Sequence, residues 1–164
     1  MPLVPPPPVV AVPRLEHVCD LSVAVGKPLS IGEGGAGERR VVEITGGEVT
    51  GPRLQGRILP GGADVQIIRG VALGGLTELA ARYVIEASDG ALIFVENLGI
   101  RSGPPEAMER LRRGDPVDPA LIYFRSTPRF ETAAPAHTWL MQRLFVCTGI
   151  RRPDRVVLSV FEVA

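Results

Sequence analysis

The chain has 164 residues, with 18 basic and 18 acidic side chains and therefore a formal net charge of zero. This length is typical of one domain with a buried core. The charge balance argues against a nucleic-acid-binding protein, which normally carries a basic face. The 19 Gly and 16 Pro residues predict many turns.

The N-terminal segment 1–13 is rich in proline, and we interpret it as a tail that precedes a single domain over residues 14–164. Cys19 and Cys147 lack the spacing of a redox pair or a metal site, which favours free thiols in a reducing cytoplasm. The sequence has neither a secretory signal pattern nor a run of about 18 apolar residues, so we expect a cytoplasmic protein without a membrane partner.

From Arg14 onward, apolar residues recur with the period of two that indicates half-buried strands. In the first strand, the apolar face carries Leu15, His17, Cys19, Leu21, Val23 and Val25. In a later strand, it carries Leu79, Ala81, Tyr83, Ile85 and Ala87. Further strand patterns cover residues 39–49, 53–59, 64–69, 91–98, 121–127, 139–148 and 155–163.

Turn residues separate these strands. Asp89-Gly90 predicts a hairpin with a type I′ turn. The segment Gly32–Gly37 has the letters of a dinucleotide-binding fingerprint, but a strand pattern follows where that fingerprint needs a helix, so a hairpin loop is predicted.

One short helix is predicted, opened by Pro104 and Pro105 and closed by Gly114. About eight or nine strands with one helix predict an all-β protein, and closure into a small antiparallel barrel removes the exposed strand edges. A barrel of this size is either filled with side chains or holds one small ligand.

Few residues point to a metal or a nucleophile. The two histidines, His17 and His137, have no acidic residue at ligand spacing, and no G-x-S-x-G motif is present. We therefore expect no metal and no cofactor. His17 lies on an apolar strand face, where it is either a hydrogen-bonded core residue or an acid/base group in a pocket.

The segment Tyr123–Glu131 combines aromatic, basic and acidic residues. On a strand, Tyr123 and Arg125 share one face and Phe124 has the other. Either the phenol and guanidinium bind a substrate carbonyl or carboxylate, or that face is the solvated exterior and Phe124 lies in the core. Across a barrel, Asp64 could face Arg82 or Arg125 as a charged pair in apolar surroundings. Trp139 is either a core residue or a pocket wall.

A set of phrases in a fixed order resembles the bacterial domain-of-unknown-function family 3237, also filed as uncharacterised protein family 0311. The phrases are Ile44–Gly47, Gly51–Gly56, Leu59–Asp64, Ala81–Tyr83, Asp89–Ile93, Tyr123–Arg125, Pro128–Glu131, Trp139–Leu140 and Leu144–Val146. The resemblance covers residues 14–163 and implies a small antiparallel β-barrel, similar to lipocalin-like and allene-oxide-cyclase-like barrels. Three positions depart from the family pattern, because aliphatic residues replace polar or aromatic ones at Val65, Ala80 and Met141.

The leading hypothesis is a small-molecule-binding barrel that works without a cofactor as an isomerase or cyclase. Its substrate would be mostly apolar with a carbonyl or hydroxyl group, and the zero net charge fits an uncharged ligand. The candidate catalytic residues are the donors Arg82, Tyr123 and Arg125 and the acid/base groups Asp64, Glu131 and His17. The candidate ligand-binding residues are Tyr83, Phe124, Phe130, Trp139 and Met141.

Two alternatives remain open. One is a non-catalytic binding or carrier protein for a hydrophobic metabolite. The other is a solid-cored barrel that acts through homo-oligomerisation. A cavity of a few hundred cubic ångströms would favour the ligand hypotheses over the solid core.

Overall fold

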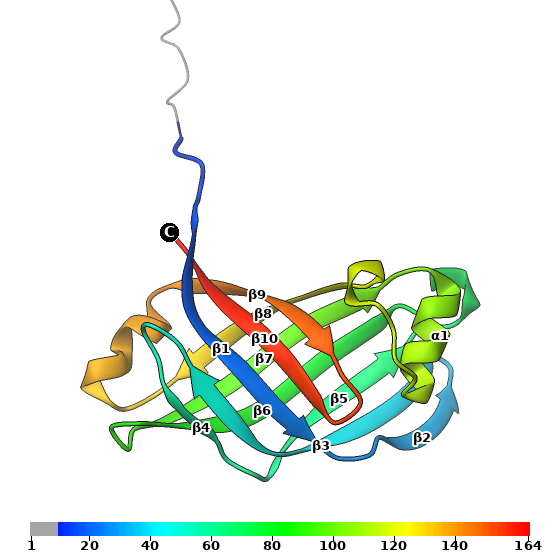
Figure 1. The fold of residues 1–164 in the computed structure, drawn as a ribbon, viewed down its shortest axis with the longest axis horizontal. Helices are drawn as coiled ribbons and strands as arrows, with labels where there is room; N and C mark the ends of the chain where they lie inside the picture. The colour runs from blue at the N-terminus through cyan, green and yellow to red at the C-terminus, as the bar shows by residue number, and fades with distance from the viewer. Residues whose placement is uncertain (1–9) are drawn as a thin grey trace, which may run out of the picture.

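In the computed structural model, which describes residues 10–164, ten strands form one antiparallel sheet that closes on itself (Figure 1). The strands are β1 (Leu15–Val25), β2 (Leu29–Gly34), β3 (Gly37–Thr50), β4 (Gly56–Ile58), β5 (Gly62–Ile68), β6 (Thr77–Ala87), β7 (Leu92–Ser102), β8 (Tyr123–Glu131), β9 (Leu144–Arg151) and β10 (Arg155–Val163). The predicted class, a small antiparallel β-barrel, is confirmed.

The long strand β3 closes the barrel. Along one edge it pairs first with β2 and then with β1, and along the other first with β5 and then with β4. Strands β4 and β5 both pair with β6 on their other edge, so together they occupy one position in the barrel wall. The barrel therefore has eight wall positions and two extra strands.

The predicted helix is confirmed as α1 (Pro105–Arg113), which ends at Gly114 in the left-handed conformation with φ 85°. Three 3-10 segments also occur, η1 (Val71–Leu73), η2 (Pro119–Leu121) and η3 (Pro135–Met141). The strand predicted from residue 139 is wrong at its start, because residues up to Met141 belong to η3. Within residues 10–164, no helix is both long enough and apolar enough to span a bilayer.

Of the predictions for the two glycine-containing turns, one is confirmed and one is wrong in turn type. Gly34 pairs with Gly37, so the segment Gly32–Gly37 forms the predicted hairpin. The type I′ turn predicted at Asp89-Gly90 is wrong. Gly90 has φ 86° and donates to the Ala87 carbonyl at 2.8 Å, while Asp89 keeps a negative φ, as in a type I turn followed by a left-handed glycine.

A β-bulge in β1 changes which side chains point inward. The pairing with β10 shifts between His17 and Cys19, which inserts Val18 as an extra residue. Cys19, Leu21 and Val23 are buried inside the barrel, whereas His17 is exposed. The expectation that His17 points into the core or a cavity is therefore wrong.

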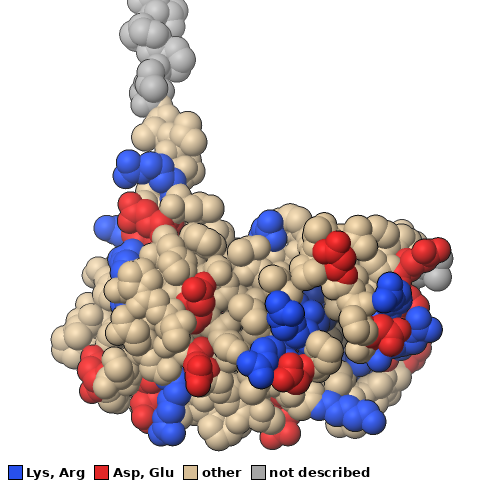
Figure 2. All heavy atoms as spheres, in the orientation of Figure 1, with Lys and Arg blue, Asp and Glu red and all other residues tan. Residues whose placement is uncertain are grey.

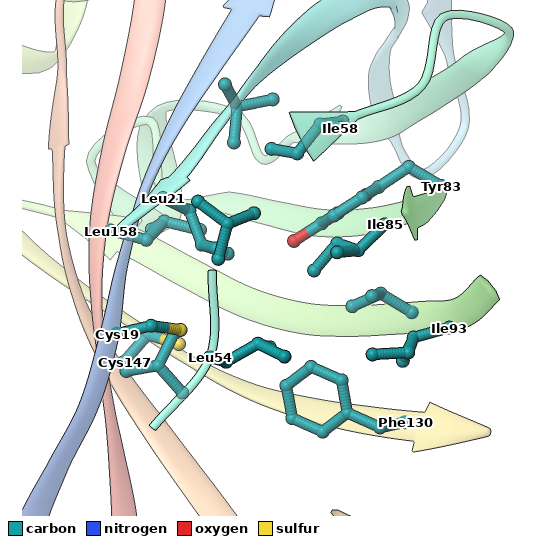
Figure 3. Close-up of a cluster of buried hydrophobic side chains, with 14 of the residues drawn as sticks. Cys19, Leu21, Leu54, Ile58, Tyr83, Ile85, Ile93, Phe130, Cys147 and Leu158 are labelled. Atoms are coloured by element: carbon teal, nitrogen blue, oxygen red, sulfur yellow. The ribbon is translucent and has the colours of Figure 1, made fainter. Parts of the chain in front are cut away.

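Apolar side chains fill one end of the barrel. Figure 3 shows Leu54, Ile85, Ile93 and Phe130 close together there, and Leu54, Ile85 and Ile93 are at most 2% exposed. Phe145 packs edge-on against Phe130 at 5.1 Å and against Trp139 of η3 at 6.0 Å. In Figure 1, η3 and α1 lie at opposite ends of the barrel. The filled end is therefore the η3 end, and the polar part of the interior lies toward α1.

Candidate functional site

A pocket enters the barrel at the α1 end. Its inner part has a volume of about 50 Å³ and opens into a hollow of about 1010 Å³ at the barrel mouth. The residues common to both parts are Val25, Val42, Gln66, Arg101 and Arg151. The two spaces therefore form one funnel, and we call these shared residues its neck.

Strand alternation places the polar residues of the inner pocket. Strand β5 contributes Asp64 and Gln66, and β7 contributes Asn97 and Arg101. The remaining lining is mostly apolar and comes from six strands, with Val23, Val25, Val42, Ile44, Leu79, Ala81, Tyr83, Phe124, Ser126, Arg151, Val156 and Leu158. A few polar groups in apolar surroundings are typical of a small-molecule site.

Asp64 is the one carboxylate among the residues that line the inner pocket. Its Oδ2 atom accepts a hydrogen bond from Gln66 Nε2 at 2.8 Å, and its Oδ1 atom accepts one from the Ala80 backbone N–H at 3.2 Å. Burial raises the pKa of Asp64, although these hydrogen bonds and the positive charge of Arg101 act in the opposite direction. A raised pKa makes the Asp64 carboxylate a stronger base than a solvated one, which suits it to proton transfer.

Arg101 is 6% exposed, and its guanidinium lies 5.3 Å from the centre of the Phe124 ring. Burial lowers the pKa of Arg101 to about 10, while the nearby Asp64 opposes this shift. Within residues 10–164, Arg101 Nε, Tyr83 Oη and Asn97 Oδ1 are buried without a hydrogen-bond partner. Because unpaired buried polar groups are costly, such groups point to a bound ligand or ordered water.

The structure brings three of the predicted residues together in the pocket, namely Asp64, Tyr83 and Phe124. Two predicted wall residues lie elsewhere, Phe130 buried in the core and Trp139 partly buried against it. Phe130 belongs to the filled end, and Trp139 packs against Phe145 and beneath the Arg53 guanidinium at 4.3 Å. Neither lines the pocket, so the placement of these two residues in its wall is wrong.

The remaining candidates lie on the outer surface. Met141 is 45% exposed. Glu131 is exposed at the end of β8. His17 is bonded through Nε2 to Asp20 Oδ1 at 3.1 Å.

The predicted donors also face outward. Arg82 is exposed and donates through Nε to Glu96 at 2.7 Å. Tyr123 and Arg125 are exposed and stack on each other at 5.0 Å. The charged pair considered between Asp64 and Arg82 or Arg125 is therefore not formed. For β8, the alternative with Phe124 in the core and Tyr123 outside is correct.

Sequence reasoning missed Arg101 and Arg151, although a signal for both existed. The alternation that places Ile93, Val95 and Asn97 inside continues to Arg101, but the strand was predicted to end at residue 98. In the same way, β9 runs past the predicted end at residue 148, which puts Arg151 in phase with the buried Phe145 and Cys147.

The described part of the chain, residues 10–164, has no group of three or more His, Cys, Asp or Glu side chains placed to hold a metal ion. Cys19 and Cys147 are free and buried in the core. The polar groups that line the inner pocket are one carboxylate, two guanidiniums, one phenol, the Ser126 hydroxyl and the amides of Gln66 and Asn97.

Comparison with known proteins supports the fold. A UPF0311 protein of Rhodopseudomonas palustris is 50% identical over 153 residues, which cover 92% of this chain and 98% of that protein. A UPF0311 protein of Clostridium acetobutylicum is 41% identical over 150 residues, covering 91% of this chain and 93% of that protein.

Solved structures agree with these relatives. The crystal structure of the R. palustris protein has a TM-score of 0.89 at 48% identity, covering 94% of this chain and all of that one. A β-barrel-like protein of Acinetobacter baumannii has a TM-score of 0.81 at 36% identity, covering 99% of this chain and all of that one. An enzyme of Penicillium herquei, at 19% identity, shares the fold with a TM-score of 0.70 over 96% of this chain and 98% of that one.

The model of the family described as "Protein of unknown function (DUF3237)" matches residues 13–163. This match spans the whole barrel, and it agrees with the relatives named above. The chain belongs to the DUF3237 family.

Proposed function

We propose that the funnel binds a mostly apolar small molecule with a carbonyl or hydroxyl group and promotes its isomerisation or cyclisation by proton transfer. The observation that carries this proposal is the position of Asp64. It is a carboxyl group with a raised pKa in a mostly apolar pocket, among polar atoms that lack partners within the protein.

The size of the pocket determines how such a substrate would be bound. The inner part, of about 50 Å³, has room for a group about the size of three to five waters. The hollow at the mouth is about twenty times larger, so it would hold the body of the substrate. The reacting group would therefore enter the barrel, and the rest would lie under α1.

The chemistry follows from the groups in the inner pocket. The Asp64 carboxylate takes a proton from the carbon next to a substrate carbonyl, and the electron pair moves onto the carbonyl oxygen. Burial raises the pKa of Tyr83, so its hydroxyl stays protonated and donates to that oxygen. Arg101 supplies a positive charge nearby. Return of the proton from Asp64 to a different carbon gives the isomer, and attack by the enolate on a second site of the molecule gives a ring.

Hydrogen–deuterium exchange tests this step without knowledge of the natural substrate. The purified protein is incubated in D₂O with 2-tetralone and with cyclohex-3-en-1-one, and proton NMR follows loss of the protons beside the carbonyl. We expect the wild-type chain to accelerate exchange, and the Asp64→Asn variant to lose at least about a hundredfold of that acceleration.

Arg125→Ala is the matched control, because Arg125 is a charged residue on the outer face of β8. This variant should exchange at the wild-type rate. Equal acceleration by wild type and Asp64→Asn would overturn the proposal. Binding of the ketones without any accelerated exchange would instead favour the carrier function.

A further inference from the structure

We infer that the molecule bound in this funnel carries an oxyanion, which is bound between the neck arginines Arg101 and Arg151 and the adjacent Arg40 of the hollow. This inference rests on the proposed function, because it names a chemical class for the ligand of the same pocket. It concerns a second part of the ligand, outside the group that meets Asp64.

Three guanidiniums lie at the neck or beside it. Arg101 and Arg151 line both the inner pocket and the hollow, and Arg40 lines the hollow beside them. Burial is the main cause that lowers the pKa of each, and the positive charges of Arg40 and Arg151 add to this effect on Arg101. Figure 2 shows several basic side chains, with acidic ones among them, on the α1 side of the molecule.

These arginines have no acidic partner. Among residues 10–164, none of the three forms an ion pair. Arg40 donates to the Arg112 carbonyl at 3.1 Å, and Arg151 donates to the Arg152 carbonyl. The Nε atoms of Arg40 and Arg101 are buried without a partner in the same part of the chain.

The acidic groups at the mouth are mostly bound to other arginines. Glu38 and Glu109 both pair with Arg112, at 3.3 and 2.9 Å, and Asp154 pairs with Arg155 at 3.0 Å.

The remaining charges at the mouth do not neutralise the neck either. Lys27 and Glu33 are both exposed on the rim, with opposite charges. Arg69 pairs with Glu78 at 2.9 Å, and Arg113 pairs with Asp115 at 3.4 Å. Asp64 is the carboxylate that faces the arginines, and its oxygens are already bonded to Gln66 and Ala80. The neck therefore has an excess of positive charge, although the whole chain is neutral.

An oxyanion fits this arrangement for two reasons. Guanidiniums bind carboxylates and phosphates through paired, charge-assisted hydrogen bonds, which would use the free Nε atoms. A negative charge would also relieve the repulsion between the three arginines, which the nearby carboxylates of Glu38, Asp64 and Asp154 offset only in part. The ligand would then place its anionic group at the neck and its apolar body along Val25, Val42 and the side of α1 that faces the hollow.

Calorimetric titration with matched acids and amides tests this inference. The acids are benzoate, cinnamate, 2-naphthoate and decanoate, each compared with its primary amide, and phenyl phosphate is added to compare phosphate with carboxylate. We expect at least one acid to bind wild type about tenfold or more tightly than its amide, with a smaller preference in 0.5 M NaCl. Arg40→Gln and Arg151→Gln should each reduce that preference, with little change for the amide.

Arg125→Gln serves as the control and should keep the wild-type preference. If every acid and its amide bound equally, the inference would be overturned while the pocket proposal stood. If no acid, amide or phosphate bound, both would be overturned. Equal losses of acid and amide affinity in the neck variants would show that these arginines only support the pocket's shape, which also contradicts the inference. A preference for phenyl phosphate over benzoate would support the inference and identify the oxyanion as a phosphate.

Discussion

Asp64 and Arg101 are opposite charges inside the barrel, yet they do not form an ion pair. Asp64 is bonded to Gln66 and to the Ala80 backbone, whereas Arg101 lies over the Phe124 ring. A tight ion pair would neutralise both groups and fill the space between them. Their separation leaves both side chains available to a bound molecule.

Asp64 should therefore cost the free protein stability at neutral pH. Its pKa is raised in the folded state, so its contribution to folding is fully present at low pH and is lost as pH rises through the folded pKa. We expect Asp64→Asn to raise the Tm at pH 7 by about 2–4 °C, which corresponds to about 1 kcal/mol for a chain of this size.

The difference in Tm between Asp64→Asn and wild type should shrink as pH falls below the folded pKa of Asp64. Thermal unfolding from pH 4 to pH 8 checks this dependence. Glu131→Gln, which changes an exposed carboxylate of β8, should show no comparable gain. A lower Tm for Asp64→Asn at pH 7 would mean that the carboxylate stabilises the fold, contrary to this account.

At the scale of elements, alternation in the sequence predicts the inner faces where a strand is regular. Tyr83 and Phe124 are correctly placed for this reason, since β6 and β8 keep the period of two throughout. A bulge breaks the period in β1, and no residue type near His17 announces it. The neck arginines Arg101 and Arg151 lie at the ends of β7 and β9. There the apolar residues become fewer, and alternation alone does not show at which residue the strand pairing ends.

Which strands lie across the pocket from one another depends on closure of the barrel, and no local pattern records it. The barrel closes where β1 pairs with β3. On their other edges, β1 pairs with β10 and β3 pairs with β4. The sequence therefore predicts that Asp64 and Gln66 share one strand face, but it does not predict which face points inward or that Arg101 rather than Arg125 is the nearby basic residue.

Strand β9 also contributes to the pocket through a residue without a side chain. A Cβ atom at Gly149 would lie 2.7 Å from the Phe124 ring and 2.8 Å from Leu158. Both neighbours line the inner pocket, so Gly149→Ala should push the Phe124 ring into it. We expect a loss of about 1–3 kcal/mol in the free energy of unfolding and weaker binding of the preferred acid.

Urea unfolding and calorimetry measure these two effects. Gly35→Ala is the matched control, since a Cβ there has open space and the backbone has no positive φ. That variant should match wild type in both measurements. Unchanged acid binding by a folded Gly149→Ala protein would show that the Phe124 ring does not limit the pocket.

At the scale of the whole molecule, the well-packed core and the pocket lie at opposite ends of the barrel. The η3 end is packed with aromatic and aliphatic side chains, while the α1 end contains the pocket and the free charges. A protein whose costly unpaired polar groups lie at one end can keep a well-packed core at the other. The two ends should therefore respond differently to the same kind of substitution.

Phe145 and Phe124 allow this comparison, because they are 3% and 4% exposed and lie at opposite ends. We expect Phe145→Leu and Phe124→Leu each to reduce the free energy of unfolding by about 1–3 kcal/mol. Only Phe124→Leu should weaken acid binding and ketone exchange, because only Phe124 lines the pocket. Trp139→Ala should behave like Phe145→Leu, since Trp139 packs on Phe145 at the filled end. Urea unfolding, calorimetry and deuterium exchange on the three variants test whether the two ends respond differently. Equal losses of acid binding in all three variants would show that the two ends act as one unit.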